Sequence, residues 1–130
     1  MAAGQTNIDE AATLTLSTNQ KTNLFEHVFE ESDAAGMLSI SIIARRVSDG
    51  MMKMFHGMVC YYIVAGAPVI CGMNNMQTIG TPQELADFSD IKADCEMQSG
   101  NFCIAVTSMD AVEFDWACSV KGFSANHVVE

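Results

Sequence analysis

Strict alternation of apolar and polar residues is the feature of this sequence that most limits its fold. From 112 to 120 every second residue is apolar, and most residues between them are polar. Successive side chains of a β-strand point to opposite faces, so this pattern predicts a strand with one buried face. Phe114 and Trp116 are its largest side chains, and we expect them to be core anchors rather than a sugar-stacking surface. The expected inward face comprises Val112, Phe114, Trp116, Cys118 and Val120.

Other segments repeat this alternation or are rich in apolar and β-branched residues, and turn residues separate them. Ser48-Asp49-Gly50 and Gly100-Asn101 are turn signals of this kind. Thr81-Pro82-Gln83-Glu84 instead resembles a helix start, so at most one short helical turn is expected near 82–88. Residues 24–29 fit either a helical turn or a buried strand, and we prefer the strand. The expected strands lie at 13–17, 24–29, 37–47, 51–56, 58–64, 67–71, 91–97, 102–106 and 112–120.

The spacing of these segments predicts an all-β fold. About eight short strands, with turn signals every 8–12 residues or so, are typical of an antiparallel β-sandwich of the jelly-roll or immunoglobulin-like kind. The chain has 130 residues, a common size for one domain, and no repeat or linker interrupts it. We therefore expect an extended, polar N-terminal arm over residues 1–12 and a single β-sandwich domain over 13–130.

The charge balance argues against several classes of partner. Sixteen Asp and Glu residues face six Lys and Arg residues, which gives a formal net charge of −10. Such a surface repels phosphate groups, so we expect no nucleic-acid partner and no basic contact with a membrane surface. Residues 57–73 are uncharged, but they contain three glycines and a proline and fall short of a membrane-spanning length. Two buried strands explain this stretch better.

The sequence contains no recognised catalytic or metal-binding motif. Five cysteines and three histidines form no CxxC or CxxH spacing, and nucleotide-binding, hydrolase and zinc-protease signatures are absent. We expect no catalytic residue, no cofactor and no metal, and mostly reduced, buried thiols, with a Cys60–Cys71 bridge as the alternative. The densest polar cluster is interpreted as a solvated loop, with a metal site as the alternative. This cluster comprises Glu26, His27, Glu30, Glu31 and Asp33.

A basic pair and a group of methionines stand out as a candidate subunit interface. Arg45 and Arg46 are adjacent, and they can neutralise carboxylates either locally or across a subunit contact. Ten methionines are many for this length, and the flexible thioether suits both irregular cores and adaptable contact surfaces. The candidate interface residues are Arg45, Arg46, Met51, Met52 and Met54.

The order of several short motifs resembles a β-sandwich module of tailed-bacteriophage virion structural proteins, of the decoration or cement, spike or tail-fibre type. The resemblance covers about residues 13–121 and departs from the module at Ser108, where glycine is usual, and at Tyr61-Tyr62, where a basic pair is usual. In order, the motifs are the Arg-Arg…Asp-Gly hairpin at 42–50, Ala65-Gly66 followed by Ala67-Pro68-Val69-Ile70, Ala93-Asp94-Cys95, Gly100-Asn101, Ile104-Ala105-Val106-Thr107 and the tryptophan strand at 114–120.

The resemblance implies a non-enzymatic virion protein that assembles in the host cytoplasm. It favours a capsid decoration or cement subunit that contacts copies of itself, as an expected homotrimer, and the major capsid protein or another virion protein. The N-terminal arm is then expected to add a strand to a neighbour's sheet. One alternative is a tail-fibre or spike module that binds a host-surface glycan, which would expose Trp116 or Tyr61 and Tyr62. The other is a small β-barrel enzyme or ligand carrier, which would have a pocket with converging polar groups.

Overall fold

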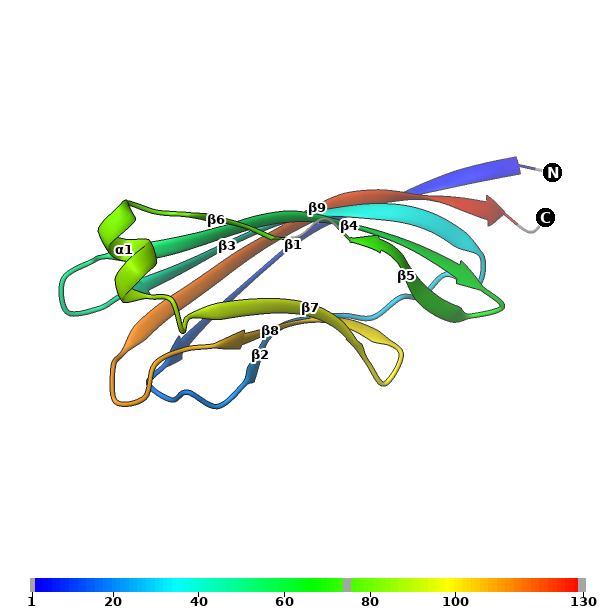
Figure 1. Cartoon of the computed structure of the whole chain (residues 1–130). Coiled ribbons are helices and arrows are strands. Elements are labelled where there is room, and N and C mark those ends of the chain that lie inside the picture. Colours follow the sequence, from blue (N-terminus) through cyan, green and yellow to red (C-terminus); the bar gives the residue numbers. More distant parts are fainter. Residues whose placement is uncertain (1, 74–75, 129–130) are drawn as a thin grey trace.

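The computed structural model describes residues 2–73 and 76–128, which form nine strands and one short helix. All strand pairs are antiparallel, and two sheets lie over one another as a β-sandwich (Figure 1). This arrangement confirms the fold class expected from the sequence. The elements are β1 (Ala2–Leu16), β2 (Thr22–His27), β3 (Ala34–Arg46), β4 (Met52–Val64), β5 (Ala67–Met73), β6 (Gln77–Ile79), α1 (Pro82–Asp87), β7 (Lys92–Gln98), β8 (Asn101–Thr107) and β9 (Phe114–Val128).

The two sheets differ in size. The large sheet has the strand order β1-β9-β3-β4-β5, and the short strand β6 pairs with β4 on the same side as β5. The small sheet has the order β2-β8-β7. Strands β1 and β9 pair along their whole lengths, so the two ends of the chain lie together in Figure 1. Helix α1 lies in the connection from β6 of the large sheet to β7 of the small sheet.

The core lies between the two sheets. Most even-numbered residues of β3 and β9 and most odd-numbered residues of β4 are buried there. Phe114 and Trp116 are 0% and 1% exposed, and the ring of Trp116 stacks on Phe55 with centroids 6.2 Å apart. The indole N–H of Trp116 donates to Ser108 Oγ at 3.3 Å, so its polar atom is also satisfied. Val112 precedes β9 and is only half-buried.

Several strands are longer than the sequence pattern indicates, and β9 continues to Val128, beyond the end expected at residue 120. The arm expected over residues 1–12 is, from Ala2 onward, part of the 15-residue strand β1, because β9 pairs with its backbone groups along its whole length. Met1 lies outside the described residues. The strands expected at 51–56 and 58–64 are one strand, since Gly57 continues β4 rather than ending it. The uncharged stretch 57–73 forms strand structure, and no described helix is long and apolar enough to span a membrane.

Helix α1 and the tight turns follow the local signals of the sequence. Thr81 is the N-cap of α1: its Oγ1 accepts a hydrogen bond from the Glu84 N–H at 3.1 Å, and the Glu84 carboxylate accepts one from the Thr81 N–H at 2.9 Å. This reciprocal capping box confirms the expected helix start. At the β4–β5 turn, Ala65 and Gly66 have φ values of 51° and 79°, as a two-residue hairpin with the native strand twist requires.

Candidate interaction surfaces

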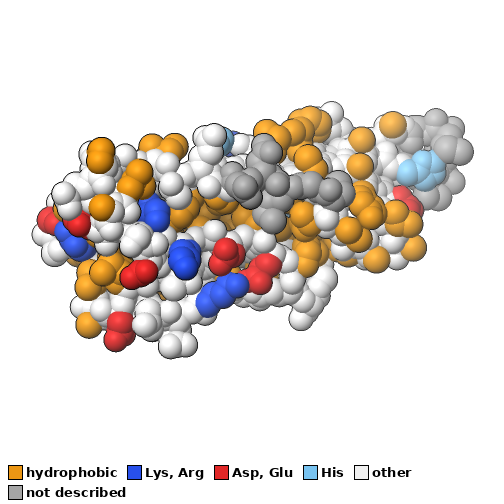
Figure 2. Space-filling model, in the orientation of Figure 1, with side chains coloured by type: hydrophobic (Ala, Val, Ile, Leu, Met, Phe, Trp, Pro, Cys, Tyr) orange, Lys and Arg blue, Asp and Glu red, His pale blue; other side chains and the backbone are white. Residues whose placement is uncertain are grey.

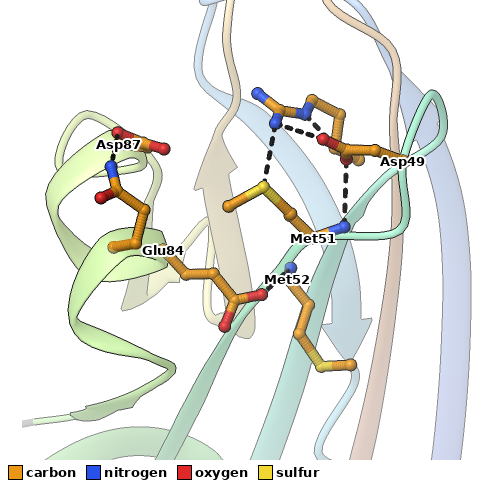
Figure 3. Close-up of polar contacts among 7 residues, drawn as sticks. Asp49, Met51, Met52, Glu84 and Asp87 are labelled. Atoms are coloured by element: carbon orange, nitrogen blue, oxygen red, sulfur yellow. Dashed lines mark hydrogen bonds and ion pairs between the residues drawn. The ribbon is translucent and has the colours of Figure 1, made fainter.

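The β3–β4 turn carries a cluster of polar contacts next to α1 (Figure 3). The Arg46 guanidinium donates two hydrogen bonds to Asp49, from Nε to Oδ1 at 3.0 Å and from Nη2 to Oδ2 at 2.6 Å. It also lies 5.0 Å from the centroid of the Phe88 ring. The Met51 N–H donates to Asp49 Oδ1 at 3.1 Å. The bonds from Arg46, and then that from Met51, lower the pKa of Asp49 to about 2, so this carboxylate is charged at neutral pH.

Helix α1 is held against the same turn by one carboxylate. Glu84 Oε2 accepts a hydrogen bond from the Met52 N–H at 2.7 Å (Figure 3), and this bond is the main cause of the lowered pKa of Glu84. Behind the helix, Lys53 is buried, and its Nζ donates to the carbonyl oxygens of Phe88 at 3.0 Å and Ile91 at 2.8 Å. The turn, the helix and the segment after it therefore support one another.

The five candidate interface residues fall into two groups. Arg46 is occupied by its local contacts, and Met51 packs against the core with its sulfur 3.2 Å from Arg46 Nη2. Arg45, Met52 and Met54 lie on the opposite face of the large sheet, where Met52 is 38% exposed. Adjacent residues of a strand point to opposite faces, which separates Arg45 from Arg46. The second group lies on the open face of the sheet, and whether it contacts another molecule stays a prediction.

The outer face of the large sheet consists of the odd-numbered residues of β1, β3 and β9, the even-numbered residues of β4, and their neighbours in β5 and β6. Nine large hydrophobic side chains are exposed in the part of the chain that the structure describes, and all but Val28 and Val47 lie on this face. Figure 2 shows hydrophobic side chains along the upper rim, over the large sheet, and toward β5. The seven on the outer face are Ile43, Met52, Tyr62, Val64, Val69, Ile79 and Phe123.

The described side chains of the outer face carry no net formal charge. The two acidic residues, Asp9 and Asp115, are balanced by Arg45 and Lys121, and Asp9 lies directly opposite Lys121 on the paired strand. Most of the other polar residues here are serine, threonine, asparagine or glutamine. Because the whole chain has a formal charge of −10, its excess negative charge lies elsewhere.

A shallow hollow of about 660 Å³ opens on the outer face near the β3–β4 turn. The small side chain of Ala117 leaves this space between the larger residues of β1 and β3. Thr15 Oγ1 donates to Asp115 Oδ1 at 2.8 Å along its border. Although Trp116 borders the hollow, its side chain is buried on the other side of the sheet. The hollow is lined by Thr13, Leu14, Thr15, Ile43, Arg45, Asp115, Trp116 and Ala117.

The outer face of the small sheet has the opposite character. Asn23 and Gln98 exchange two amide hydrogen bonds, at 2.9 and 3.0 Å, between β2 and β7. Lys21 Nζ lies 2.9 Å from Glu96 Oε1, and this contact raises the pKa of Lys21 and lowers that of Glu96. Strand β8 is buried on both faces beneath them. These polar groups are bonded to one another, and this face offers little apolar surface to a partner.

The polar cluster expected around His27 is divided by the fold. His27 Nδ1 lies 2.8 Å from Glu10 Oε2, beside a hollow of about 300 Å³ between β1 and the segment after β2. Glu26 instead accepts a hydrogen bond from Asn101 Nδ2 at 2.7 Å on the small sheet, and Asp33 accepts one from a backbone N–H of the β4–β5 turn at 3.3 Å. Within residues 2–73 and 76–128, no three His, Cys, Asp or Glu residues are grouped to hold a metal ion.

The cysteines differ in their access to solvent. Cys60 is exposed on the outer face, whereas Cys103 and Cys118 are buried and Cys95 is half-buried. Burial raises the pKa of the Cys95 thiol to about 12 and also raises those of Cys103 and Cys118, so these thiols are poor nucleophiles. The side chain of Cys71 lies outside the described part of the chain, and so does the alternative of a Cys60–Cys71 bridge.

The aromatic residues that a glycan-binding module would expose are divided between core and surface. Trp116 and Tyr61 are each 1% exposed, whereas Tyr62 is 40% exposed on the outer face.

Phe123 and Ile43 share this face, and neither was among the interface residues expected from the sequence. A signal was present: Ile43 is apolar on the polar side of an alternating segment, and 58–64 is uncharged on both faces. Strands that are apolar on both faces are typical of sheets covered on both sides.

Comparisons with known proteins identify a similar fold but no sequence family. No family model matches the chain, and no curated protein matches it either. The crystal structure of the tailspike protein of Acinetobacter baumannii phage AM24 is similar in fold, with a TM-score of 0.50 and 8% sequence identity. The match covers 97% of this chain and 26% of the tailspike chain, so this chain spans about a quarter of that protein's length.

Proposed function

We propose that this chain is a non-enzymatic structural protein of a bacteriophage virion, and more specifically a capsid decoration or cement subunit. The observation that carries the proposal is the outer face of the large sheet, which exposes seven large hydrophobic side chains and has no net charge on a strongly acidic protein. Large exposed apolar patches mark contacts with other proteins. The order of the sequence motifs and the fold similarity to a phage tailspike protein support a virion setting.

The difference between the two outer faces suits a protein that sits on a larger assembly. A decoration subunit acts by burying surface between neighbours, and the large sheet offers apolar surface for this purpose. The small sheet has its polar groups paired within the chain, and acidic residues dominate the remaining surface. A charged surface of one sign stays hydrated and discourages further association, so it is suited to the side that faces solvent.

A tail-fibre or spike module that binds a host-surface glycan is the second candidate. The fold similarity to a phage tailspike protein favours it, and so does the hollow on the outer face, where Thr15 and Asp115 present polar oxygen atoms. The buried positions of Trp116 and Tyr61 count against it, because sugar binding uses exposed aromatic rings. For a small enzyme or ligand carrier, the polar hollow beside His27 and Glu10 is one candidate pocket.

Virions of the phage that encodes this chain provide the test. We expect mass spectrometry to find the protein in purified particles and a particle map to place it in many copies on the shell. Particles that lack it should release DNA at a lower temperature than complete particles, because the contacts between neighbouring subunits are lost.

Adding back the purified protein should restore the release temperature, and heat-unfolded protein is the control. Density confined to the tail would support the glycan-binding alternative. Absence from purified particles, with abundant protein in the lysate, would refute a structural role in the virion.

A further inference from the structure

We propose that the outer face of the large sheet binds a second copy of this chain, forming a two-fold pair in which the two large sheets pack face to face. This inference rests on the structural role proposed for the same face, and it names the partner. Sheets pack in this way inside β-sandwiches, about 10 Å apart and with strand directions within about 30° of each other.

One apolar cluster lies at the end of the outer face that holds the chain termini. Phe123 of β9 lies opposite Met37 of β3, and Tyr62 of β4 lies opposite Val69 of β5. Phe123 is 49% exposed and Tyr62 is 40% exposed. Aromatic side chains that remain this exposed, next to other apolar side chains, are typical of the centre of a protein contact.

A second apolar cluster lies at the other end of the face, near α1. Met54 of β4 lies opposite Ile43 on one side and Ile79 on the other, so the three side chains form a row across the sheet. Between the two clusters the face is mainly polar apart from Met58, and Ser41 Oγ lies 3.1 Å from His56 Nδ1 there. Two apolar clusters on either side of a polar middle can pair twice with the same face of a second copy turned by 180°.

The rotation axis that achieves this pairing lies between the sheets, perpendicular to the strands. This rotation places the apolar cluster beside the chain termini of each copy on the apolar cluster near α1 of the other copy. It also brings the polar regions between the clusters together. One patch therefore serves both subunits, as in the two-fold contacts that most protein dimers use.

The face is large enough for a stable pair. Strands β3 and β4 have 13 residues each, which corresponds to a length of about 43 Å, and five strands are about 24 Å wide. The face therefore covers on the order of 1,000 Å² per copy, and a stable interface uses about 800 Å² per partner. Contact over most of the face meets this requirement.

The charges favour a second copy over a basic partner. A basic protein would be attracted to the acidic surfaces, whereas this face is neutral, with Asp9 and Asp115 balanced by Arg45 and Lys121. Two chains that each carry a formal charge of −10 repel one another. The neutral face is where two copies approach with the least electrostatic cost.

The face-to-face pair does not use the N-terminal strand as the sequence led us to expect. Residues 2–16 pair with β9 of the same chain along their whole length, so they form the edge strand of the large sheet rather than a free arm. A face-to-face pair leaves β1 in place, and it replaces the expected homotrimer with a dimer.

Sedimentation equilibrium of the full chain and two matched variants tests the pair. Ile43 on the outer face and Val47 in the β3–β4 turn are both 38% exposed, so Ile43→Lys and Val47→Lys add the same charge at sites of equal exposure. We expect wild type and Val47→Lys to have the mass of two chains at tens of micromolar, and Ile43→Lys to have the mass of one. Near-ultraviolet circular dichroism of Trp116 confirms folding, and Tyr62→Lys replaces Ile43→Lys if that variant does not fold.

Cys60 provides a second measurement, because it lies on the outer face and is exposed in the single chain. In wild type its alkylation should slow several-fold as the protein concentration rises, and in the monomeric variant it should not. Peptide mapping by mass spectrometry separates this thiol from the others.

A wild-type monomer, a trimer, or a pair that survives both Ile43→Lys and Tyr62→Lys would overturn the inference. A monomer that still binds shells lacking the protein would overturn the pair and leave the proposed function standing. If the chain forms the pair in solution but is absent from purified virions, the pair stands and the proposed function is overturned.

Discussion

The carboxylate of Asp49 accepts two hydrogen bonds from the Arg46 guanidinium and one from the Met51 N–H. These bonds favour the charged form, so the pKa of Asp49 falls from 3.8 to about 2 in the folded chain. The unfolded chain therefore binds the proton more readily. The contribution of Asp49 to stability is present above about pH 4 and is lost as the pH falls toward about 2.

Replacing Asp49 with asparagine should remove this part of the acid sensitivity. We expect the urea midpoint of wild type to fall more steeply than that of Asp49→Asn between about pH 4 and pH 2, because only wild type loses a charged, bonded carboxylate there. Asp110→Asn, at an exposed position in the β8–β9 connection, is the control. Equal slopes for wild type and Asp49→Asn would show that the turn contacts do not hold the charged form.

Arg45 and Arg46 show what the sequence predicts about single residues and what it does not. Alternation predicts that they point to opposite faces, and the structure places them so. It does not predict which arginine has an internal partner, because Arg46 lies over Phe88, a residue that the chain reaches only after β6 and α1. For the outer face the sequence carries only a partial signal, in Ile43 and the uncharged residues 58–64, because the exposure of Tyr62 and Phe123 depends on which strands are neighbours.

Among the elements, the β3 backbone leaves no room for a side chain at Gly122 of β9. A Cβ atom there would overlap the carbonyl oxygen of Met37, which is part of the β3 backbone. At Gly57 of β4 a Cβ atom would instead meet the sulfur of Met76 at 2.5 Å, the flexible part of a side chain. Both glycines lie within strands, but Gly122 faces a neighbouring backbone and Gly57 faces a flexible side chain.

Substituting each glycine with alanine should separate the two cases. Gly122→Ala should lower the free energy of unfolding by about 1–3 kcal/mol or more, because the backbone of β3 must shift. Gly57→Ala should cost less, since the Met76 side chain can change its rotamer. Urea unfolding followed by Trp116 fluorescence measures both, and an equal or smaller cost at Gly122 would contradict the close packing of β3 on β9.

The elements also show where sequence patterns fail. The first half of β9, up to residue 120, and the start of α1 were predictable, because alternation and the capping box are local signals. Residues 2–12 were expected to be an arm, because they lack an apolar run and their strand structure depends on β9, which lies more than 100 residues away. Gly57 looked like a break between strands, yet β3 pairs with β4 at Gly57 and on both sides of it, which keeps the strand continuous.

At the scale of the whole molecule, negative charge and apolar surface are separated. Figure 2 shows acidic and basic side chains mainly toward α1 and the small sheet, and hydrophobic side chains mainly over the large sheet. The excess of acidic residues therefore opposes association in general, while the outer face of the large sheet favours it at one place. These two effects respond differently to salt.

Pairing through the neutral outer face should become stronger as salt is added. Each copy carries a formal charge of −10, and this long-range repulsion is screened as the Debye length falls from about 14 Å near 0.05 M to about 4 Å near 0.5 M salt. The apolar contacts are not weakened by the same change. We therefore expect the dissociation constant of the wild-type pair to fall several-fold over this range in sedimentation equilibrium.

A charge variant separates screening from a general effect of salt on apolar contacts. Glu30 and Glu31 follow β2 and are not part of the strands that form the outer face, so replacing both with glutamine reduces the repulsion and leaves the apolar clusters of that face unchanged. This variant should pair more tightly than wild type at low salt and should respond less to added salt. If salt instead dissociates the pair, then ion pairs across the interface hold the two copies together. The inference that apolar contacts of the outer face hold the pair would then be wrong.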